Sequence, residues 1–345
     1  MKRYLFYVSQ NYSFQILRPL QKAIRARGDE VKWFFEGSEV NHNYLQSDEL
    51  VLSSVADVND YKPVAIFAPG NMIPNFIQGL KVAIFHGFNV GKLNQRGGED
   101  HFQIRGCFDL YCTQGPNTTI RFQELAKQYG YFRVIETGWS AMDPLFDDTT
   151  QASDIGKPIV LLCSTFSRNL TCAPHIYDEV ARLSKQGNWR WLVQFHPKMP
   201  VDIVAKYKGL QNEHLTFIET DNVLPLLQQA DVMVCDTSSV LVMFLLQQKP
   251  VVTFRNISPG PFLYDITEAD KLENAISHAL KKPDDLMCEI RNFISHTHPY
   301  RDGGSSERVL QAVDKVLAED LPLKRKPANL LRNFKARKKL AYWRF

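Results

Sequence analysis

One histidine lies where a strand-like run ends and the chain can turn. His86 follows the apolar residues of VAIFHG (82–87) and precedes Gly87, a residue type that permits sharp turns. An imidazole titrates near neutrality, so a histidine in this place is suited to act as a general base. Taken singly, it is more typical of a hydrogen-bonded structural histidine.

A second histidine ends the apolar run WRWLVQFH (189–196). Pro197 follows His196 and biases it towards an extended conformation, and Lys198 stands two residues further on. A histidine that donates a hydrogen bond, together with a nearby lysine, suits phosphate oxygens. This pair, too, is more typical of a structural role when it is considered alone.

Hydroxyl side chains follow a third strand-like run, VMVC (232–235), and precede an apolar helical pattern. The residues concerned are Asp236, Thr237, Ser238 and Ser239. Free N–H groups at the start of a helix attract anions, and adjacent hydroxyls add further donors. The segment therefore indicates a phosphate site, and the alternative is a helix N-cap alone.

A glycine-rich segment, DGGSSERV (302–309), precedes the last strong helical pattern. Its two glycines let the backbone approach a ligand, Ser305 and Ser306 can cap the helix that begins at Glu307, and Arg308 can face a phosphate. An ordinary capping segment between a loop and a helix explains these residues equally well.

These residues need a scaffold that brings strand ends together, and the apolar pattern predicts one. Short runs rich in β-branched and aromatic residues alternate with helical patterns, first over residues 4–139 and again from residue 159. Such alternation is typical of a parallel sheet covered by helices on both faces. We expect two doubly wound α/β domains, 1–147 and 158–315, joined by the polar stretch DDTTQASDIGKP (147–158), with residues 316–345 as a basic C-terminal helix or tail. A ligand shared by both domains is expected in a cleft between them.

Several classes of protein are excluded or disfavoured. Neither half carries G-x-G-x-x-G after its first strand, and the chain has no Walker A motif and no D-x-D pair for a metal-dependent sugar transferase. The six cysteines form no C-x-x-C and no metal-like cluster, so we expect buried reduced thiols, no metal site and no cofactor. The chain also has no apolar run of the roughly 20 residues that a membrane-spanning helix needs and no signal-peptide pattern, which favours the cytoplasm.

The net charge of +4 is unevenly distributed. Residues 322–345 contain nine of the 41 Lys/Arg and none of the 37 Asp/Glu, so the rest of the chain carries 32 basic against 37 acidic residues. A general nucleic-acid surface is therefore not indicated. The tail mixes cations with leucines and aromatic residues, which suits either an anchor on anionic lipids over 324–345 or a helix that packs back on the first domain.

Taken together and in order, six segments of the chain resemble the bacterial CDP-glycerol glycerophosphotransferases, the group of teichoic-acid primases and polymerases. The family pattern has W-H-G-T-P, G-Y-P-R-N-D, A-P-T, L-H-P, D-Y-S-S and D-G-x-A-S-E-R. The corresponding segments here are Phe85-His86-Gly87-Phe88, Gly138-Trp139-Ser140-Ala141-Met142-Asp143, Cys163-Ser164-Thr165, Phe195-His196-Pro197, Asp236-Thr237-Ser238-Ser239 and Asp302-Gly303-Gly304-Ser305-Ser306-Glu307-Arg308.

The resemblance implies a GT-B fold with an acceptor-side first domain and a nucleotide-donor second domain. It implies that His86 is the catalytic base and that His196, Ser238 and Ser239 hold donor phosphates. An alcohol would attack the β-phosphorus of a CDP-activated polyol and expel CMP, and the lipid-linked acceptors of the family favour the inner face of the cytoplasmic membrane. The other residues implied at the donor site are Gly87, Thr165, Lys198, Asp236, Thr237, Ser305, Ser306, Glu307 and Arg308, with Gly138 and Asp143 elsewhere in the cleft.

Departures from the family pattern leave the substrates open. Phe88 and Asn89 replace Thr and Pro, and Ala141 and Met142 replace Arg and Asn. Ribitol phosphate, another polyol phosphate or a sugar therefore remains possible, in a teichoic acid, a capsule or an O-chain. The alternatives are a GT-B glycosyltransferase or 2-epimerase that acts on a UDP-sugar, and a non-catalytic scaffold of a glycan-assembly complex.

Overall fold

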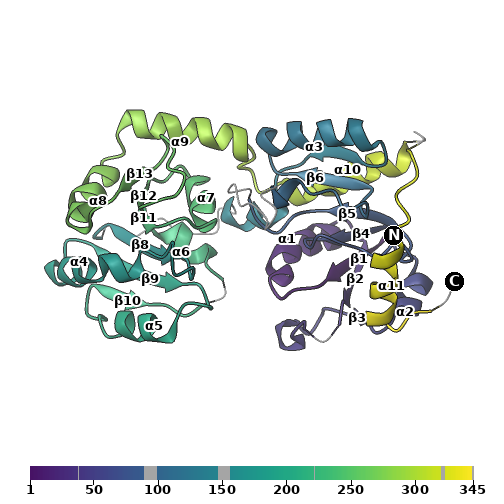
Figure 1. Cartoon of the computed structure of the whole chain (residues 1–345), viewed down its shortest axis with the longest axis horizontal. Coiled ribbons are helices and arrows are strands. Elements are labelled where there is room, and N and C mark those ends of the chain that lie inside the picture. Colours follow the sequence, from purple (N-terminus) through teal and green to yellow (C-terminus); the bar gives the residue numbers. More distant parts are fainter. Residues whose placement is uncertain (38, 89–98, 147–155, 221, 320–322, 344–345) are drawn as a thin grey trace. The chain divides into compact units, whose positions relative to one another are not determined.

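The computed structural model describes residues 1–37, 39–88, 99–146, 156–220, 222–319 and 323–343. The chain folds as two compact units, which are coloured by sequence in Figure 1. The first unit comprises Met1–Pro144 and His296–Phe345, and the second comprises Leu145–Ser295. Most of the expected linker, residues 147–155, lies outside the described residues. The boundary after residue 295 differs from the domain expected over 158–315, because the chain returns to the first unit before its last two helices.

The first unit contains a seven-stranded sheet in which every pair of neighbouring strands is parallel. The strands are β1 (Arg3–Val8), β2 (Glu30–Phe35), β3 (Val51–Leu52), β4 (Ala65–Ala68), β5 (Leu80–Ala83), β6 (Leu110–Thr113) and β7 (Arg133–Glu136), in the order β3-β2-β1-β4-β5-β6-β7. The strand order reverses between β1 and β4. In sheets of this kind, ligands bind beyond the carboxyl ends of the strands at such a reversal.

Helices cover both faces of this sheet, and side chains along β1 alternate between the two faces. The helices are α1 (Ser13–Ala26), α2 (Val55–Tyr61), α3 (Pro116–Tyr129), α10 (Ser305–Ala318) and α11 (Leu330–Lys339), with single 3₁₀ turns at His42–Tyr44 and Asp100–Phe102. A longer 3₁₀ segment, Ser140–Phe146, continues into the second unit. Phe6 and Trp33 meet at 5.0 Å on the face that α1 covers. Leu5 and Tyr7 point to the opposite face and share a core with residues of α2 and α3. Burial on both faces explains the almost continuous apolar runs.

The basic tail packs on the first unit, one of the two possibilities left open by its composition. Lys326 forms an ion pair of 2.6 Å with Asp109, and the rings of Phe76 and Tyr342 stack at 5.4 Å. The guanidinium of Arg337 lies 4.5 Å above the ring of Phe76. These contacts fix α11 by one of its faces. No helix among the residues described is both long enough and apolar enough to span a membrane.

The second unit repeats the same topology with six parallel strands. The strands are β8 (Ile159–Ser164), β9 (Arg190–Phe195), β10 (Leu215–Phe217), β11 (Val232–Cys235), β12 (Val251–Phe254) and β13 (Tyr264–Ile266), in the order β10-β9-β8-β11-β12-β13. The helices are α4 (Ala173–Gln186), α5 (Val201–Lys208), α6 (Leu224–Gln229), α7 (Val240–Leu245), α8 (Leu272–Leu280) and α9 (Asp284–Thr297), with a 3₁₀ turn at Ala269–Lys271. Two doubly wound parallel sheets are therefore confirmed, and in this unit the order reverses between β8 and β11.

Candidate functional site

In the first unit, His86 stands just beyond β5 in a turn of unusual backbone geometry. The preceding residue, Phe85, has a φ of +60°, a left-handed conformation that costs energy for a residue with a side chain. Nδ1 of His86 lies 3.0 Å from the carbonyl oxygen of Pro69, which follows β4. A carbonyl can only accept, so Nδ1 carries the proton and Nε2 of the neutral ring keeps its lone pair. The ring therefore presents a proton acceptor through Nε2.

The two residues after His86 are held by residues that follow neighbouring strands. The buried Gln114, beyond β6, donates a hydrogen bond of 3.1 Å from Nε2 to the carbonyl oxygen of Gly87. The ring of Phe88 meets Trp139 edge to face at 5.1 Å. Apart from its chain neighbours, no atom of the described residues would lie within 4 Å of a Cβ atom placed on Gly87, so these residues leave space beside Gly87.

A second histidine, His101, supports the turn from the other side. Its ring stacks on Phe85 at 5.1 Å. Burial, with a smaller contribution from His86, lowers the pKa of His101 to about 4. His101 is therefore neutral at physiological pH and adds no charge beside His86. Among the described residues, no three His, Cys, Asp or Glu side chains are grouped so as to hold a metal ion.

Asp143 and Gly138, both expected in the cleft, make contact with the start of α10. The carboxylate of Asp143 accepts hydrogen bonds from the backbone N–H groups of Ser305 and Ser306 at 2.8 and 2.7 Å. Burial raises the pKa of Asp143, and these donors oppose the rise. Gly138 has a φ of +76°, and a Cβ there would lie 2.5 Å from Oγ of Ser305. Asp143 is thus the N-terminal cap of α10, supplied by a segment about 160 residues earlier in the chain.

The side chains of Glu307 and Arg308 also contact groups of the first unit. Glu307 accepts a hydrogen bond of 2.9 Å from Nε of Arg27. The guanidinium of Arg308 donates to Asp302 at 2.8 Å and lies 4.1 Å above the ring of Tyr300. The structure thus places Ser305, Ser306, Glu307 and Arg308 with His86 in the first unit, and not on the donor domain expected from the sequence. Their role at a donor site remains a prediction.

In the second unit, Asp236 links the ends of the two central strands, β11 and β8, through hydrogen bonds. Its buried carboxylate accepts hydrogen bonds from Oγ of Ser164 at 2.6 Å, from the N–H of Thr165 at 3.1 Å and from the N–H of Cys172 at 3.0 Å. Burial raises the pKa of Asp236, and the hydrogen bonds oppose this rise. Because its oxygens already accept these bonds, the side chain serves to position Thr165.

The hydroxyl residues that follow Asp236 become progressively more exposed. Oγ1 of Thr237 accepts a hydrogen bond of 3.1 Å from the N–H of Ile257, Ser238 is half-buried and Ser239 is exposed. Ser239 occupies the N-cap position of α7, and no hydrogen bond from its side chain caps the helix. The paired serines are therefore available beyond the carboxyl end of β11.

His196 and Lys198 lie beyond β9, and His196 lines a cavity of about 420 Å³. The cavity is lined by Phe195, His196, Pro197, Val204, Phe217, Ile218, Glu219 and Thr220. Nδ1 of His196 accepts a hydrogen bond of 3.0 Å from the N–H of Lys198, so the proton of the neutral ring is on Nε2. The ammonium of Lys198 lies 5.8 Å from the centre of the Phe166 ring. His196 thus has the opposite tautomer to His86 and presents a donor.

The residues around His86 carry no distinctive signal in the sequence. Tyr12, Pro69 and Gln114 each follow a strand of the first sheet, and Tyr12 stacks on the imidazole ring at 5.3 Å. Glu219 and Thr220, which line the cavity beyond β10, carry no distinctive signal either. All of these residues lie just after a strand. That position does not distinguish them, because short polar stretches follow strands throughout the chain.

Comparison with solved structures shows the same fold. The chain is similar to "S. aureus MnaA-UDP co-structure", with 16% identity, a TM-score of 0.65 and coverage of 92% of this chain and 97% of that one. A putative UDP-N-acetylglucosamine 2-epimerase from Listeria monocytogenes has 14% identity and a TM-score of 0.67, with 93% and 99% covered. The wall teichoic acid polymerase TagF has 14% identity and a TM-score of 0.62, with 92% and 90% covered. These similarities confirm the expected GT-B fold.

The sequence comparisons identify the family. A comparison with curated protein sequences gave no match. The family model described as CDP-Glycerol:Poly(glycerophosphate) glycerophosphotransferase matches residues 111–315, which is more than half of the chain. The match includes His196 and the Asp236–Ser239 segment, whereas His86 lies before it. The chain therefore belongs to the CDP-glycerol:poly(glycerophosphate) glycerophosphotransferase family and is a phosphotransferase-type enzyme of this kind.

Proposed function

We propose that the enzyme transfers glycerol phosphate, or a related polyol phosphate, from a CDP-activated donor to a hydroxyl group of a cell-surface glycan or a lipid-linked acceptor. The acceptor oxygen attacks the β-phosphorus, the bond from that phosphorus to the oxygen bridging the two phosphates breaks, and CMP leaves with that oxygen. A phosphodiester forms, and the proton of the acceptor hydroxyl passes to a base. The family membership supports this type of reaction.

The observation that carries the proposal is the tautomer of His86. The carbonyl of Pro69 holds the proton on Nδ1, so Nε2 has a lone pair that can accept the proton of an attacking hydroxyl. The exposed ring and the open space at Gly87 leave room for an acceptor. We therefore assign His86 the role of general base.

The donor is assigned to the second unit. His196 presents an Nε2–H group, and the ammonium of Lys198 lies near it, so both can bind phosphate oxygens, with Ser238 and Ser239 as further donors. The adjoining cavity has aromatic walls from Phe195 and Phe217 with polar groups at Glu219 and Thr220, and its volume suits a nucleoside. One TagF variant structure comes from a crystal soaked with CDPG, which supports a CDP-linked donor in this family.

The second candidate is an enzyme that acts on a UDP-sugar. The similarity to the MnaA structure with UDP and to a 2-epimerase favours it, since these proteins cover as much of the chain as TagF does. The third is a scaffold that binds glycan-assembly enzymes without turnover. CMP release identifies the phosphotransferase. A UDP-sugar glycosyltransferase releases UDP, a 2-epimerase converts the UDP-sugar to its epimer with no net nucleotide release, and a scaffold does none of these.

The test is nucleotide release from CDP-glycerol, CDP-ribitol and UDP-sugars in the presence of a membrane extract. We expect CMP release that falls at least a hundredfold in His86→Asn, in line with the usual contribution of a general base. The matched control is His42→Asn, which changes another exposed histidine of the same unit. UDP release would move the enzyme to the second candidate. Equal CMP release by His86→Asn and wild type would exclude His86 as the base.

We propose further that the tail associates with an anionic membrane surface, as expected for an enzyme with a lipid-linked acceptor on the inner face of the cytoplasmic membrane. On α11, Leu330, Leu331 and Phe334 have exposed fractions of 76%, 82% and 57%, whereas Ala336 of the same helix is buried. Trp343 packs against Phe334 at 5.7 Å. We call these four exposed residues the outer face of α11.

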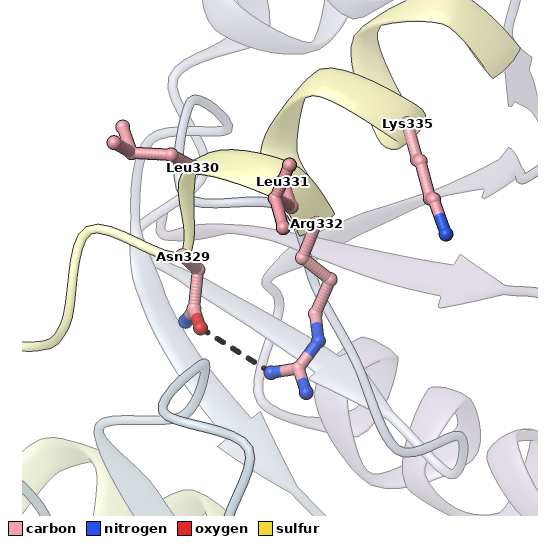
Figure 2. Close-up of a pocket in the computed structure, with 5 residues that line it drawn as sticks. All are labelled: Asn329, Leu330, Leu331, Arg332 and Lys335. Carbon is pink, nitrogen blue, oxygen red and sulfur yellow. Dashed lines mark hydrogen bonds between the residues drawn. The ribbon is translucent and has the colours of Figure 1, made fainter.

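A cation, Lys335, lies close to the outer face. Figure 2 shows Lys335 and Arg332 on the same helix as Leu330 and Leu331, around a recess of about 500 Å³, and the guanidinium of Arg332 donates to the carbonyl of Arg105 at 2.6 Å. The oxygen of Asn329 accepts a hydrogen bond from Arg332, which orders the start of the helix. Apolar side chains flanked by exposed lysines are typical of helices that lie at the surface of anionic lipid.

Sedimentation with vesicles tests this association. We expect binding to phosphatidylglycerol vesicles, weaker binding at high salt, and little binding to phosphatidylcholine vesicles. Leu331→Glu with Phe334→Glu should abolish binding, whereas Ile120→Glu, at a residue 60% exposed on α3, should leave it unchanged. Equal binding by the double variant and wild type would contradict the proposal.

A further inference from the structure

An aromatic side chain covers one face of the His86 ring. Tyr12 lies between β1 and α1, at the N-cap position of that helix. Its ring stacks on the imidazole with centroids 5.3 Å apart and planes inclined by 27°. The side chain of Tyr12 is 42% exposed, so it is not a core residue placed there by packing alone.

The other contacts restrain the imidazole incompletely. The hydrogen bond from Nδ1 to Pro69 holds one ring atom, but a single hydrogen bond tolerates some rotation of the ring about the Cβ–Cγ bond. The left-handed backbone at the preceding residue, Phe85, does not itself set the plane of the ring. A parallel ring at stacking distance restricts that plane, because tilting the imidazole would bring it into the face of Tyr12. Tyr12 therefore supplies the constraint that these two contacts lack.

The charged surroundings of His86 do not explain the contact. Among the described residues, the titratable groups that interact with it are His101 and the phenol of Tyr12 itself. Burial lowers the pKa of His101 and raises that of Tyr12, so both side chains are neutral at physiological pH. An effect of Tyr12 on His86 must therefore act through ring contact and position.

We propose that Tyr12 is a positioning residue, whose ring fixes the plane of the His86 imidazole and hence the direction of the Nε2 lone pair. This inference rests on the proposed role of His86 as the base. Three strand ends that meet at the reversal of the first sheet then position a single side chain. The loop after β1 sets the ring plane, Pro69 after β4 sets the tautomer, and the turn after β5 carries the base.

Kinetics of two variants test the role of the ring. Tyr12→Leu removes the flat face, and we expect kcat to fall tenfold to a hundredfold, about the usual cost of misplacing a catalytic group. The KM for the donor should stay within about twofold. Tyr12→Phe keeps the ring and should retain the wild-type kcat, and Tyr129→Leu, at another partly exposed tyrosine of the same unit, is the control.

Three results would overturn the inference. An equal loss in Tyr12→Phe and Tyr12→Leu would assign the effect to the hydroxyl. A raised KM with unchanged kcat would make the ring a binding surface for substrate. An unchanged kcat and KM in Tyr12→Leu would remove any role.

A measurement without substrate separates this inference from the proposed function. In ¹⁵N-labelled protein, with the His86 signals assigned through His86→Asn, we expect the Nδ1–H tautomer in wild type and in Tyr12→Phe. Tyr12→Leu should show a mixture of tautomers or exchange broadening, because the ring is free to leave Pro69. An unchanged spectrum in Tyr12→Leu overturns the positioning role even if His86 is the base. Full CMP release by His86→Asn would instead contradict the role of His86 as the base while leaving the spectrum as predicted.

Discussion

Asp236 accepts a hydrogen bond of 2.6 Å from Oγ of Ser164, and this bond ties the end of β11 to the end of β8. The two strands are the central pair of the second sheet, where the strand order reverses. The N–H groups of Thr165 and Cys172 donate to the same carboxylate. In the sequence, Asp236 resembles a ligand-binding acid. In the structure, its carboxylate instead holds the loops after β8 and β11 together, and the hydroxyl groups of Ser238 and Ser239 beside it do not take part in these bonds.

Replacing Asp236 should therefore affect stability more than it affects donor affinity. Asp236→Ala leaves three donors without their acceptor in a buried place, and we expect the free energy of unfolding to fall by about 3–5 kcal/mol. Urea unfolding measures the loss, and Asp202→Ala, at an exposed acid of α5, is the control. A stable Asp236→Ala protein with a greatly raised donor KM would show that the carboxylate binds donor directly.

Gly138 is predicted to tolerate no side chain. Gly138→Ala adds a Cβ that would lie 2.5 Å from Oγ of Ser305 and 2.9 Å from the ring of Tyr300, at a φ of +76°. We expect a loss of about 1–3 kcal/mol in unfolding free energy, together with partial loss of the contact between α10 and Asp143. Gly28→Ala is a matched control, because φ is +75° there but no atom lies within 4 Å, so the difference between the two variants measures the clash.

Stability should fall as the pH drops below about 6.5. Burial lowers the pKa of His298 and of His101 to about 4, so the unfolded chain binds protons at these residues before the folded chain does. Above the unfolded pKa near 6.5, each buried histidine makes its full contribution to the free energy of unfolding. This contribution is lost as the pH falls towards 4, and at pH 5 the loss is about 2 kcal/mol per histidine.

Nε2 of the buried His298 accepts a hydrogen bond of 2.9 Å from the N–H of Trp139 and must stay unprotonated to do so. Unfolding curves at pH 7.5 and pH 5 in wild type and in His101→Leu measure the slope, which should be about half as steep in the variant. A free energy independent of pH over this range would refute the prediction.

His196 is predicted to act on the donor. His196→Ala removes the Nε2–H group that the backbone N–H of Lys198 selects, and we expect CMP release to fall by a factor of about 10²–10³, the usual cost of losing one donor to developing charge. Lys198→Ala should raise the donor KM more than it lowers kcat. His278→Ala, at an exposed histidine of α8, is the control within the same unit. Wild-type kinetics in His196→Ala would remove this residue from the site.

Much of the fold could be predicted from the sequence, because most strands are buried on both faces and read as unbroken apolar runs. The run IVLLCS, for example, is buried along its whole length as β8. The strands that the pattern did not reveal are β3, with two residues, and β13, with three, both at sheet edges where little apolar surface is buried.

The candidate site divides in the same way. His86 and His196 could be selected because each follows a strand run, and the order of six segments indicated the family. Their tautomers could not be predicted from the sequence. The tautomer of His86 depends on Pro69, about 17 residues away, and that of His196 depends on the local turn at Lys198. The position of α10 could not be predicted either. It depends on the hydrogen bond that the N–H of Ser305 donates to Asp143, and no sequence periodicity encodes this bond.

By itself, the sequence determined the class of the protein: apolar periodicity dictates parallel sheets, and polar residues at strand ends mark where chemistry can occur. Only the tertiary structure decided what each polar group does. A carboxylate or an imidazole acts according to the donors and acceptors within about 3 Å, and in a parallel sheet these come from strands far apart in the chain. Asp236 therefore links two strand ends, Asp143 caps a helix, and His86 has its proton on Nδ1, although all three follow strands in the sequence.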